Sequence, residues 1–275
     1  MLSWPAVIAL WAGLVFASLS GPRWAPPTEA ALDAMVKRLR ARPRAERVAR
    51  VSARFLGTPF VLGPLGEGRG RDADPLWRWD AVDCVTFVEQ VLALADARSL
   101  TEAEAQLQRI RYAHRIVRYG ERNHLMEPAW LPNNIRKGFV RPITKQVAGA
   151  DVRFLWRRER AADGIRDVAL PYLPIAAALA HQREIPSATV FFVARRWGHP
   201  VSDHVSHVGL LIRKNGELYA RHASAIHGRV VDEPFATFLR DERRSLRRWP
   251  VVGLELAEPS APRGGDDALE MDLPE

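Results

Sequence analysis

The 275-residue sequence contains a single cysteine, Cys84, and only four lysines among its 40 basic residues. One cysteine excludes an intramolecular disulfide, so the apolar core has to hold the fold together. The formal net charge is +8, yet the chain has no nucleic-acid-binding motif and no stripe of arginines interleaved with aromatic residues. We therefore interpret the arginine excess as a bias in composition and expect no nucleic-acid partner.

Charged side chains are also absent from the first 21 residues, and residues 4–19 are mostly apolar. Ser18 and Ser20 supply small residues at positions that a signal peptidase favours. The run also approaches the ~20 residues that an uncleaved membrane anchor needs. Residues 1–20 are thus predicted to be a signal peptide or an N-terminal anchor, and the folded part is predicted to be exported to the periplasm or cell envelope.

Composition and periodicity divide the rest of the chain into three parts. Residues 21–43 are predicted to be a linker with a helical lead-in, 44–256 a single folded domain, and 257–275 a disordered acidic tail. Besides a helix that begins at Cys84, the predicted helices cover 29–39, 44–56, 101–119, 170–181 and 234–241. The predicted strands cover 189–194, 204–212, 217–224 and 251–256. Because helices come first and strands follow, the pattern favours an α+β fold over a parallel βαβ fold.

The one cysteine stands at a predicted helix start. Val85, Val88 and Leu92 fall at helical spacing, and Asp83 just before them is a typical N-cap residue. Unpaired N–H groups and the positive end of the helix dipole favour an anion in the first turn. The pKa of a thiol placed there can fall from about 8.5 to roughly 3.5–7.5, so we expect Cys84 to be a thiolate at neutral pH. The alternative interpretation is a small buried core residue.

Two histidines are brought together by a predicted hairpin. Asn215-Gly216 between two strands is a strong signal for a two-residue turn, which pairs Lys214 with Glu217. In that register His207 and His222 lie diagonally on one face, roughly 7–8 Å apart at the backbone. A cysteine at a helix start, a histidine and a second orienting group are the components of nucleophilic acyl transfer.

We therefore assign Cys84 as the nucleophile, His207 as the general base and His222 as the residue that orients it, with no cofactor. A zinc site is the rival interpretation, with Cys84 as a further ligand to a set drawn from His199, His204, His207, His222 and His227. However, His204 and His207 lie on opposite faces of a strand, and the chain has no His-Glu-x-x-His helix. We therefore predict no metal site.

With these residues, the chain resembles the papain-like NlpC-type cysteine peptidases and amidases of bacterial cell walls. Within them it is similar to the N-acetylmuramoyl-L-alanine amidase-like family, over about residues 44–256. The resemblance rests on Leu56-Gly57-Thr58-Pro59-Phe60, Asp83-Cys84-Val85-Thr86-Phe87-Val88-Glu89, residues 130–134 and 138–144, Ser206-His207-Val208-Gly209 and His222-Ala223-Ser224.

The resemblance implies an α+β fold in which the nucleophile helix packs on a small antiparallel sheet. It implies the same three roles for Cys84, His207 and His222, and a thioester acyl-enzyme. The implied reaction is hydrolysis of the amide between N-acetylmuramic acid and L-alanine, in peptidoglycan or its muropeptide fragments, and we expect a monomer. Two alternatives stay open: an endopeptidase that cuts within the stem peptide, and a catalytically silent wall-binding domain.

Candidates for substrate contact are Asp83, Phe60, Trp130, Asn133, Asn134 and Ser206. Phe60 stands where relatives usually carry tyrosine, so a hydroxyl near the nucleophile is missing. The two asparagines could bind sugar or peptide amides, or could be turn residues that satisfy their own backbone. Trp77, Trp79 and Trp130 could stack on a sugar ring or belong to the core.

Overall fold

The computed structural model describes residues 24–161, 164–196, 203–245 and 248–262. The helices are α1 (Glu29–Leu39), α2 (Arg44–Ala53), α3 (Cys84–Asp96), α4 (Leu100–Arg111), α5 (Leu131–Arg136), α6 (Thr144–Ala148), α7 (Ile175–Ala180) and α8 (Phe235–Arg244). The strands are β1 (Val140–Pro142), β2 (Arg153–Ala161), β3 (Gly164–Pro174), β4 (Thr189–Arg195), β5 (Val205–Lys214), β6 (Glu217–Ser224), β7 (Arg229–Pro234) and β8 (Val251–Pro259).

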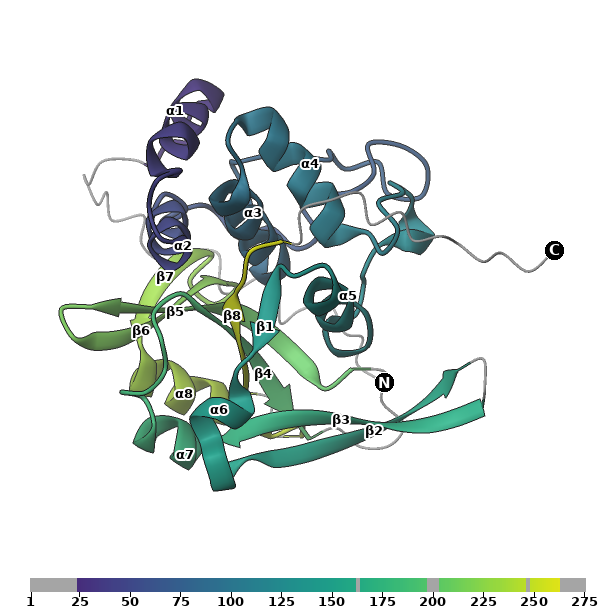
Figure 1. Cartoon of the computed structure of the whole chain (residues 1–275), viewed down its shortest axis with the longest axis vertical. Helices are drawn as coiled ribbons and strands as arrows, with labels where there is room; N and C mark the ends of the chain where they lie inside the picture. Colours follow the sequence, from purple (N-terminus) through teal and green to yellow (C-terminus); the bar gives the residue numbers. More distant parts are fainter. Residues whose placement is uncertain (1–23, 162–163, 197–202, 246–247, 263–275) are drawn as a thin grey trace, which may run out of the picture.

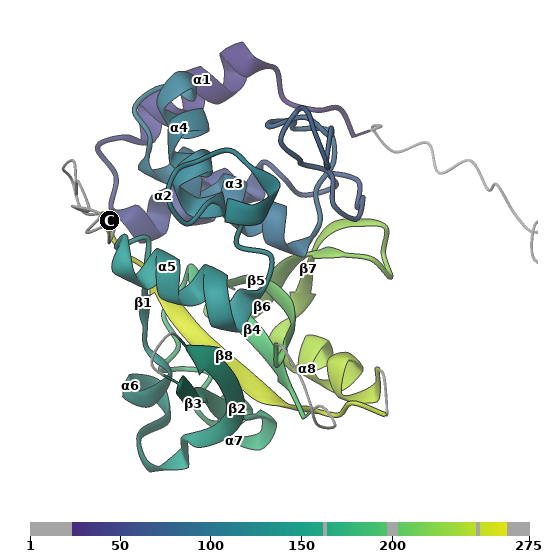
Figure 2. The ribbon, with the colours of Figure 1, turned by 90° about the vertical axis from the view of Figure 1, so that its right-hand side faces the viewer.

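The strands form one eight-stranded sheet between two groups of helices (Figures 1 and 2). Seven strands follow the order β2-β3-β8-β4-β5-β6-β7, and β1 also pairs with β8. Every pairing is antiparallel, which confirms the predicted α+β class with an antiparallel sheet. Helices α1 to α4 contribute to one core and α6 to α8 to the other, so both faces of the central strands are buried.

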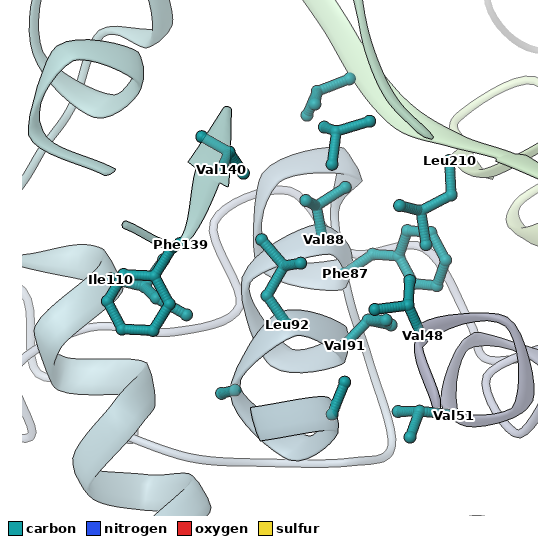
Figure 3. Close-up of a cluster of buried hydrophobic side chains, with 14 of the residues drawn as sticks. Val48, Val51, Phe87, Val88, Val91, Leu92, Ile110, Phe139, Val140 and Leu210 are labelled. Carbon is teal, nitrogen blue, oxygen red and sulfur yellow. The ribbon is translucent and has the colours of Figure 1, made fainter. Parts of the chain in front are cut away.

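Helix α3 is the centre of the larger core. Every residue from Thr86 to Ala95 is buried, because the helix is enclosed by α2, α4 and β5. Figure 3 shows Val88, Val91 and Leu92 pointing into this cluster. Except for Thr86, Glu89 and Gln90 these residues are apolar, and a helix that is apolar on almost all sides is typical of the interior of a protein. The sequence therefore places its one cysteine at the start of the most enclosed helix.

The first helix lies where it is predicted, but it belongs to the domain rather than to a lead-in. Leu32, Met35, Val36 and Leu39 of α1 are all buried in the α3 core. At the other end, β8 continues to Pro259 and pairs with β1, so the chain is ordered past residue 256. The predicted boundaries at 44 and 256 are therefore too narrow. Residues 1–20 and 263–275 lie outside the described residues.

Two predicted helices are wrong in extent. Helix α4 begins at Leu100 and ends at Arg111 instead of 119, and its N-cap is Ser99, whose hydroxyl accepts the Glu102 N–H. Residues 170–174 finish strand β3, and only Ile175–Ala180 is helical. Pro174 ends the strand, and its fixed φ suits the residue that precedes a helix.

The β2–β3 hairpin is the largest element that periodicity does not predict. Its strands pair from Arg153–Tyr172 to Ala161–Gly164, and Figure 1 shows them as a long ribbon that extends beyond the rest of the sheet. Arginines interrupt the apolar alternation of β2, so the strand is defined by its hydrogen-bonded partner.

Within the described ranges, no helix is long and apolar enough to cross a membrane.

Gly209 on β5 is a close-approach position. A Cβ atom there would lie 2.7 Å from Phe191 Cζ and 2.8 Å from the Arg221 carbonyl oxygen. Those distances are below van der Waals contact, so neither β4 nor β6 could keep its present spacing from β5.

We expect Gly209→Ala to lower the free energy of unfolding by about 1–3 kcal/mol, since over-packing a filled core forces neighbouring groups apart. Urea unfolding followed by circular dichroism measures the change. Gly120→Ala is the matched control, because nothing lies within 4 Å of its added Cβ, and it should change stability by less than about 0.5 kcal/mol. Equal effects of the two substitutions would contradict this packing argument.

Candidate active site

The start of α3 is held by a reciprocal cap. Asp83 accepts the Thr86 N–H at 2.7 Å, and the Asp83 N–H donates to the Thr86 hydroxyl at 2.9 Å. The second Asp83 carboxylate oxygen accepts the Gly63 N–H at 3.1 Å. This confirms the predicted N-cap and fixes Cys84 as the first residue of the helix.

The thiol of Cys84 lies against strand β5. The backbone N–H of Val208 donates to the sulfur, as do the N–H groups of Cys84 and Val85 at the helix start. Val208 is the neighbour of His207, so the helix start and the histidine strand meet at this point. The side chain is partly buried.

The predicted register of the β5–β6 hairpin is confirmed for the residues that pair, but the pairing does not extend to His207 and His222. Lys214 pairs with Glu217, and the ladder continues to Leu210–Arg221, where it ends. Beyond that pair, β5 remains paired with β4 and β6 with β7, while α3 contacts both β5 and β6. The two histidines therefore stand on strands that separate next to the cysteine.

His207, His222 and Glu233 form a chain of hydrogen bonds. His207 Nε2 and His222 Nδ1 are 2.8 Å apart, and His222 Nε2 lies 2.6 Å from Glu233 Oε2. The hydrogen bond to His222 lowers the pKa of Glu233, so this residue is a carboxylate. The β6–β7 pairing brings Glu233 to the histidines.

The carboxylate determines which ring nitrogens carry protons. Glu233 accepts from Nε2–H of His222, which leaves His222 Nδ1 as an acceptor in the neutral ring. His207 must then donate through Nε2–H, and its lone pair is on Nδ1. This assignment follows from the hydrogen-bond network, and it leaves His207 with one nitrogen that can accept a proton.

The prediction that Cys84 rests as a thiolate is wrong. Burial raises the pKa of Cys84 to about 12, with a further increase from the Asp83 carboxylate, and the three N–H donors offset only part of this. Burial also lowers the pKa of His207 to about 3, followed by the effects of His222 and Arg195. Loss of solvation outweighs the helix start here, so the resting pair is a neutral thiol and a neutral imidazole.

Aromatic side chains enclose the two imidazoles. The Phe238 ring of α8 lies 6.2 Å from His207 and 5.0 Å from His222 between ring centroids, and Phe191 lies 6.1 Å from His207. These apolar groups displace water from the histidines and account for the loss of solvation. They also leave few alternative rotamers for either ring.

Two residues predicted to contact substrate are structural instead. Trp130 is 1% exposed and donates its indole N–H to Glu89 at 3.0 Å. Asn134 is 0% exposed, and its amide donates to the backbone carbonyls of Trp130 and Ile110. Both side chains are buried and donate their hydrogen bonds to other groups of the protein, so a substrate could not reach them without unfolding this region.

The other candidates have different surroundings. Asp83 is buried as the helix cap, which makes it a positioning residue. Ser206 is exposed, and its hydroxyl accepts from Arg195 at 2.7 Å. Phe60 is partly buried, and its backbone forms an isolated β-bridge with Val82, two residues before the cysteine. Asn133, also partly exposed, bonds to Asn123 and Arg136.

The remaining tryptophans and histidines are divided between core and surface. Trp79 is buried and packs edge-on against the partly exposed Trp77 at 3.8 Å between ring centroids. His204 is buried and bonds to the Arg195 carbonyl, whereas His227 bonds to the Ser224 hydroxyl. Among the described residues, which exclude His199, no group of three or more His, Cys, Asp or Glu side chains could hold a metal ion.

Glu233 is the site residue that sequence reasoning missed. It follows Asp232 near the end of β7, and nothing in the local sequence distinguishes the two carboxylates. Asp232 forms an ion pair with Arg221, whereas Glu233 meets His222. Successive side chains of a strand point to opposite faces, so a strand predicted next to the one that carries His222 would place either Asp232 or Glu233, but not both, on the face of His222. This alternation is the one signal that could have distinguished the two carboxylates.

Comparison with known proteins identifies the family of this chain. The family model of the N-acetylmuramoyl-L-alanine amidase-like proteins matches residues 50–245. The chain belongs to this family. No curated protein matches the sequence.

Two solved structures show the same fold as this family member. A protein from Legionella pneumophila is 24% identical with a TM-score of 0.75, covering 86% of this chain and 95% of its own. An N-acetylmuramoyl-L-alanine amidase from Bacteroides uniformis is 20% identical with a TM-score of 0.59, covering 79% and 99% respectively. At these identities the likeness concerns the fold alone.

The raised pKa of Cys84 predicts how the resting protein reacts with iodoacetamide. Only the thiolate reacts, so below the pKa the alkylation rate should increase about tenfold per pH unit from pH 6 to pH 9. Intact-protein mass spectrometry measures the rate, and Cys84→Ser is the unlabelled control. A rate that is already constant above pH 6 would indicate a thiolate–imidazolium pair instead.

Asp83→Asn tests the cause of the shift in the same experiment. Asparagine also caps helices well, so the start of α3 should be preserved. Removal of the adjacent negative charge should lower the pKa of Cys84, and alkylation at any given pH should become faster. An unchanged rate would contradict the contribution assigned to Asp83.

Proposed function

We propose that this protein is a cysteine-dependent amidase of the papain-like NlpC type. It hydrolyses the amide between N-acetylmuramic acid and L-alanine in peptidoglycan or its fragments. The family supports peptidoglycan amidase chemistry in general. The observation that carries the cysteine mechanism is the hydrogen-bonded chain from His207 through His222 to Glu233, together with the Val208 N–H, next to His207, that donates to the Cys84 sulfur.

In the first step the Cys84 sulfur attacks the lactyl carbonyl carbon of the muramic acid. The thiol proton moves to Nδ1 of His207 as the sulfur–carbon bond forms. The carbonyl oxygen becomes an oxyanion, and N–H groups at the start of α3 donate to it. The sulfur is therefore a thiolate only during the attack, which is consistent with the neutral resting pair.

The proton on His207 next passes to the leaving nitrogen of L-alanine. The carbon–nitrogen bond breaks, the peptide departs as an amine, and the sugar remains on Cys84 as a thioester. Water then attacks the thioester while His207 accepts its proton and returns one to the sulfur. The products are the free carboxyl group of the sugar and a peptide that begins with L-alanine.

His222 and Glu233 act through His207. When His207 becomes an imidazolium, His222 accepts a hydrogen bond from its Nε2–H, and Glu233 stabilises the positive charge through His222. The same bonds hold Nδ1 of His207 toward the cysteine. His222 and Glu233 are therefore positioning residues.

We also propose that the protein acts outside the cytoplasm as a monomer. The apolar segment at residues 1–20 and the location of peptidoglycan support export, with either a cleaved signal or an N-terminal anchor. An intact set of Cys84, His207 and His222 favours an active enzyme over a silent wall-binding domain, because no structural need requires that combination.

The bond that is cut can be identified from the products. Purified disaccharide-peptide muropeptides incubated with the protein should yield a free disaccharide and a peptide starting with L-alanine, detected by mass spectrometry. Cys84→Ala should abolish both products, whereas EDTA should leave the rate unchanged. A sugar product that retains L-alanine and D-glutamate would identify an endopeptidase, and activity restored only by zinc would exclude the cysteine mechanism.

Substitutions along the hydrogen-bond chain should affect turnover more than binding. We expect His222→Ala to lower kcat by about 10²–10⁴-fold and Glu233→Gln by about 10–100-fold, each with little change in KM. His227→Ala, on an exposed residue, should leave kcat unchanged. His204 is a poorer control because it is buried, and its replacement should also lower stability. A dispensable His222 would contradict the assigned base.

A further inference from the structure

Three aliphatic side chains are exposed on two loops of the protein. Leu62 is 83% exposed and Val61 42%, both in the segment between α2 and α3, while Ile226 is 86% exposed in the turn between β6 and β7. Single exposed apolar residues are common on protein surfaces, but a group of them in one place indicates contact with an apolar partner. These three residues are termed the aliphatic rim.

Backbone pairing brings the two loops of the rim together. Pro59 forms an antiparallel bridge with Arg229, and the N–H of the next residue, Phe60, donates to the carbonyl of residue 228 at 2.9 Å. In an antiparallel pair, each step forward along one segment is a step back along the other. Leu62 and Ile226 each stand three residues beyond the bridge, so this register brings them to the same end of the pair.

Both loops are attached to elements of the candidate active site. The N–H of Gly63 donates to Asp83 at 3.1 Å, and Asp83 directly precedes Cys84. Ile226 lies just after the end of β6, four residues beyond His222. One loop is therefore bound to the helix start that carries the cysteine, and the other continues the strand that carries the histidine. A surface that contacts the rim lies next to these two elements.

The shape and charge of the rim suit the surface of a lipid bilayer. Apart from its chain neighbours, a Cβ atom added to Gly63 or Gly228 would meet no atom of the described residues within 4 Å, so both loop tips protrude into open space. Residues 57–63 and 225–230 include no aspartate or glutamate, and Arg229 is exposed. Protruding aliphatic groups beside a basic residue are typical of segments that enter the boundary between lipid phosphates and acyl chains.

The N-terminal segment joins the described chain beside the rim. A Cβ atom added to Gly57 would lie 2.8 Å from Trp24 Cδ1, so Trp24 packs directly on Gly57. The five residues from Gly57 to Leu62 span at most about 17 Å, and the four from residue 20 to Trp24 span at most about 14 Å. Residues 1–21 are uncharged and 4–19 mostly apolar. An anchor made of residues 1–20 would thus tether the domain by the side that carries the rim.

We propose that the aliphatic rim docks on the surface of a lipid bilayer, beside an uncleaved N-terminal anchor. Burial of Val61, Leu62 and Ile226 at the level of the acyl chains removes their apolar surface from water, and Arg229 meets the lipid phosphates. The start of α3 and the end of β6 are then held next to the membrane. This inference rests on the proposed export of the protein, and it does not depend on which bond the enzyme cuts.

Fluorescence of the full chain, labelled at one position, tests the docking. Cys84 is the one cysteine, so a Cys84→Ser background with Leu62→Cys or Ile226→Cys carries a single IAEDANS fluorophore. In vesicles of phosphatidylethanolamine and phosphatidylglycerol, we expect blue-shifted emission and quenching by nitroxide-labelled lipids at both positions. Because a docked side chain lies about 5–10 Å below the bilayer surface, quenching by acrylamide in the water should be at least about threefold weaker than at a control position.

Trp156→Cys is the matched control position. Trp156 is also an apolar residue with high exposure, 64%, but it lies on β2, at the opposite edge of the sheet from β7. A label there should be quenched by acrylamide and not by nitroxide-labelled lipids. In the protein labelled at position 226, adding Leu62→Glu should restore acrylamide quenching toward the control value, because a carboxylate at the rim opposes insertion.

Equal acrylamide quenching at positions 62, 226 and 156 would overturn the proposal, because the rim would then stay in water. Protection from acrylamide without quenching by nitroxide-labelled lipids would also overturn it, because residues 1–20 or a second copy of the chain would then cover the rim. The same holds if N-terminal sequencing of the exported protein begins near Gly21 rather than at Met1.

The labels report docking without any bond cleavage, which separates this inference from the proposed function. Cleavage of the muramic acid–alanine bond by a protein whose rim stays in water would reject the docking alone. Quenching by nitroxide-labelled lipids, together with cleavage at a different bond, would reject the proposed bond selectivity and keep the docking.

Discussion

The separation of β5 from β6 beyond the Leu210–Arg221 pair is the constraint on which the candidate site depends. A continuous ladder would have satisfied the Val208 N–H with a strand partner, but here this group donates to the Cys84 sulfur. Gly209 lets β4 and β6 keep their close approach to β5, and Asp83 caps the start of α3 from within its own sequence. Backbone geometry therefore places the start of α3 against the residue that follows His207 on β5.

Burial sets the electrostatics of that place. A helix start favours a thiolate, but the enclosure of Cys84 and the charge of Asp83 favour the thiol, and the second pair of effects is larger. The enclosure also keeps His207 neutral. Glu233 is the carboxylate at the end of the hydrogen-bonded series, and His222 stands between it and His207. Cys84 and His207 therefore rest as a neutral thiol and a neutral imidazole rather than as an ion pair.

Some polar residues near the site serve the fold, because their hydrogen-bonding groups bind other residues of the core. Glu89 bonds to Arg111 and to Trp130 within the core, and all three side chains are buried. Loss of one partner of such a pair costs about 3–5 kcal/mol, because the other charge is then left unpaired. A motif such as residues 130–134 can therefore be characteristic of a family for reasons of folding.

Local sequence alone determined the start of α3, the cap by Asp83 and the register of the β5–β6 hairpin. Each depends on interactions within a few residues, so periodicity, cap chemistry and the Asn215-Gly216 turn are sufficient. The β2–β3 ribbon, the end of α4 and the docking of α1 could not be predicted, because partners distant in the sequence define them. The same holds for the choice of Glu233 over Asp232 and for the neutral state of Cys84. Strand pairing and burial decide both, and those exist only after the chain has folded.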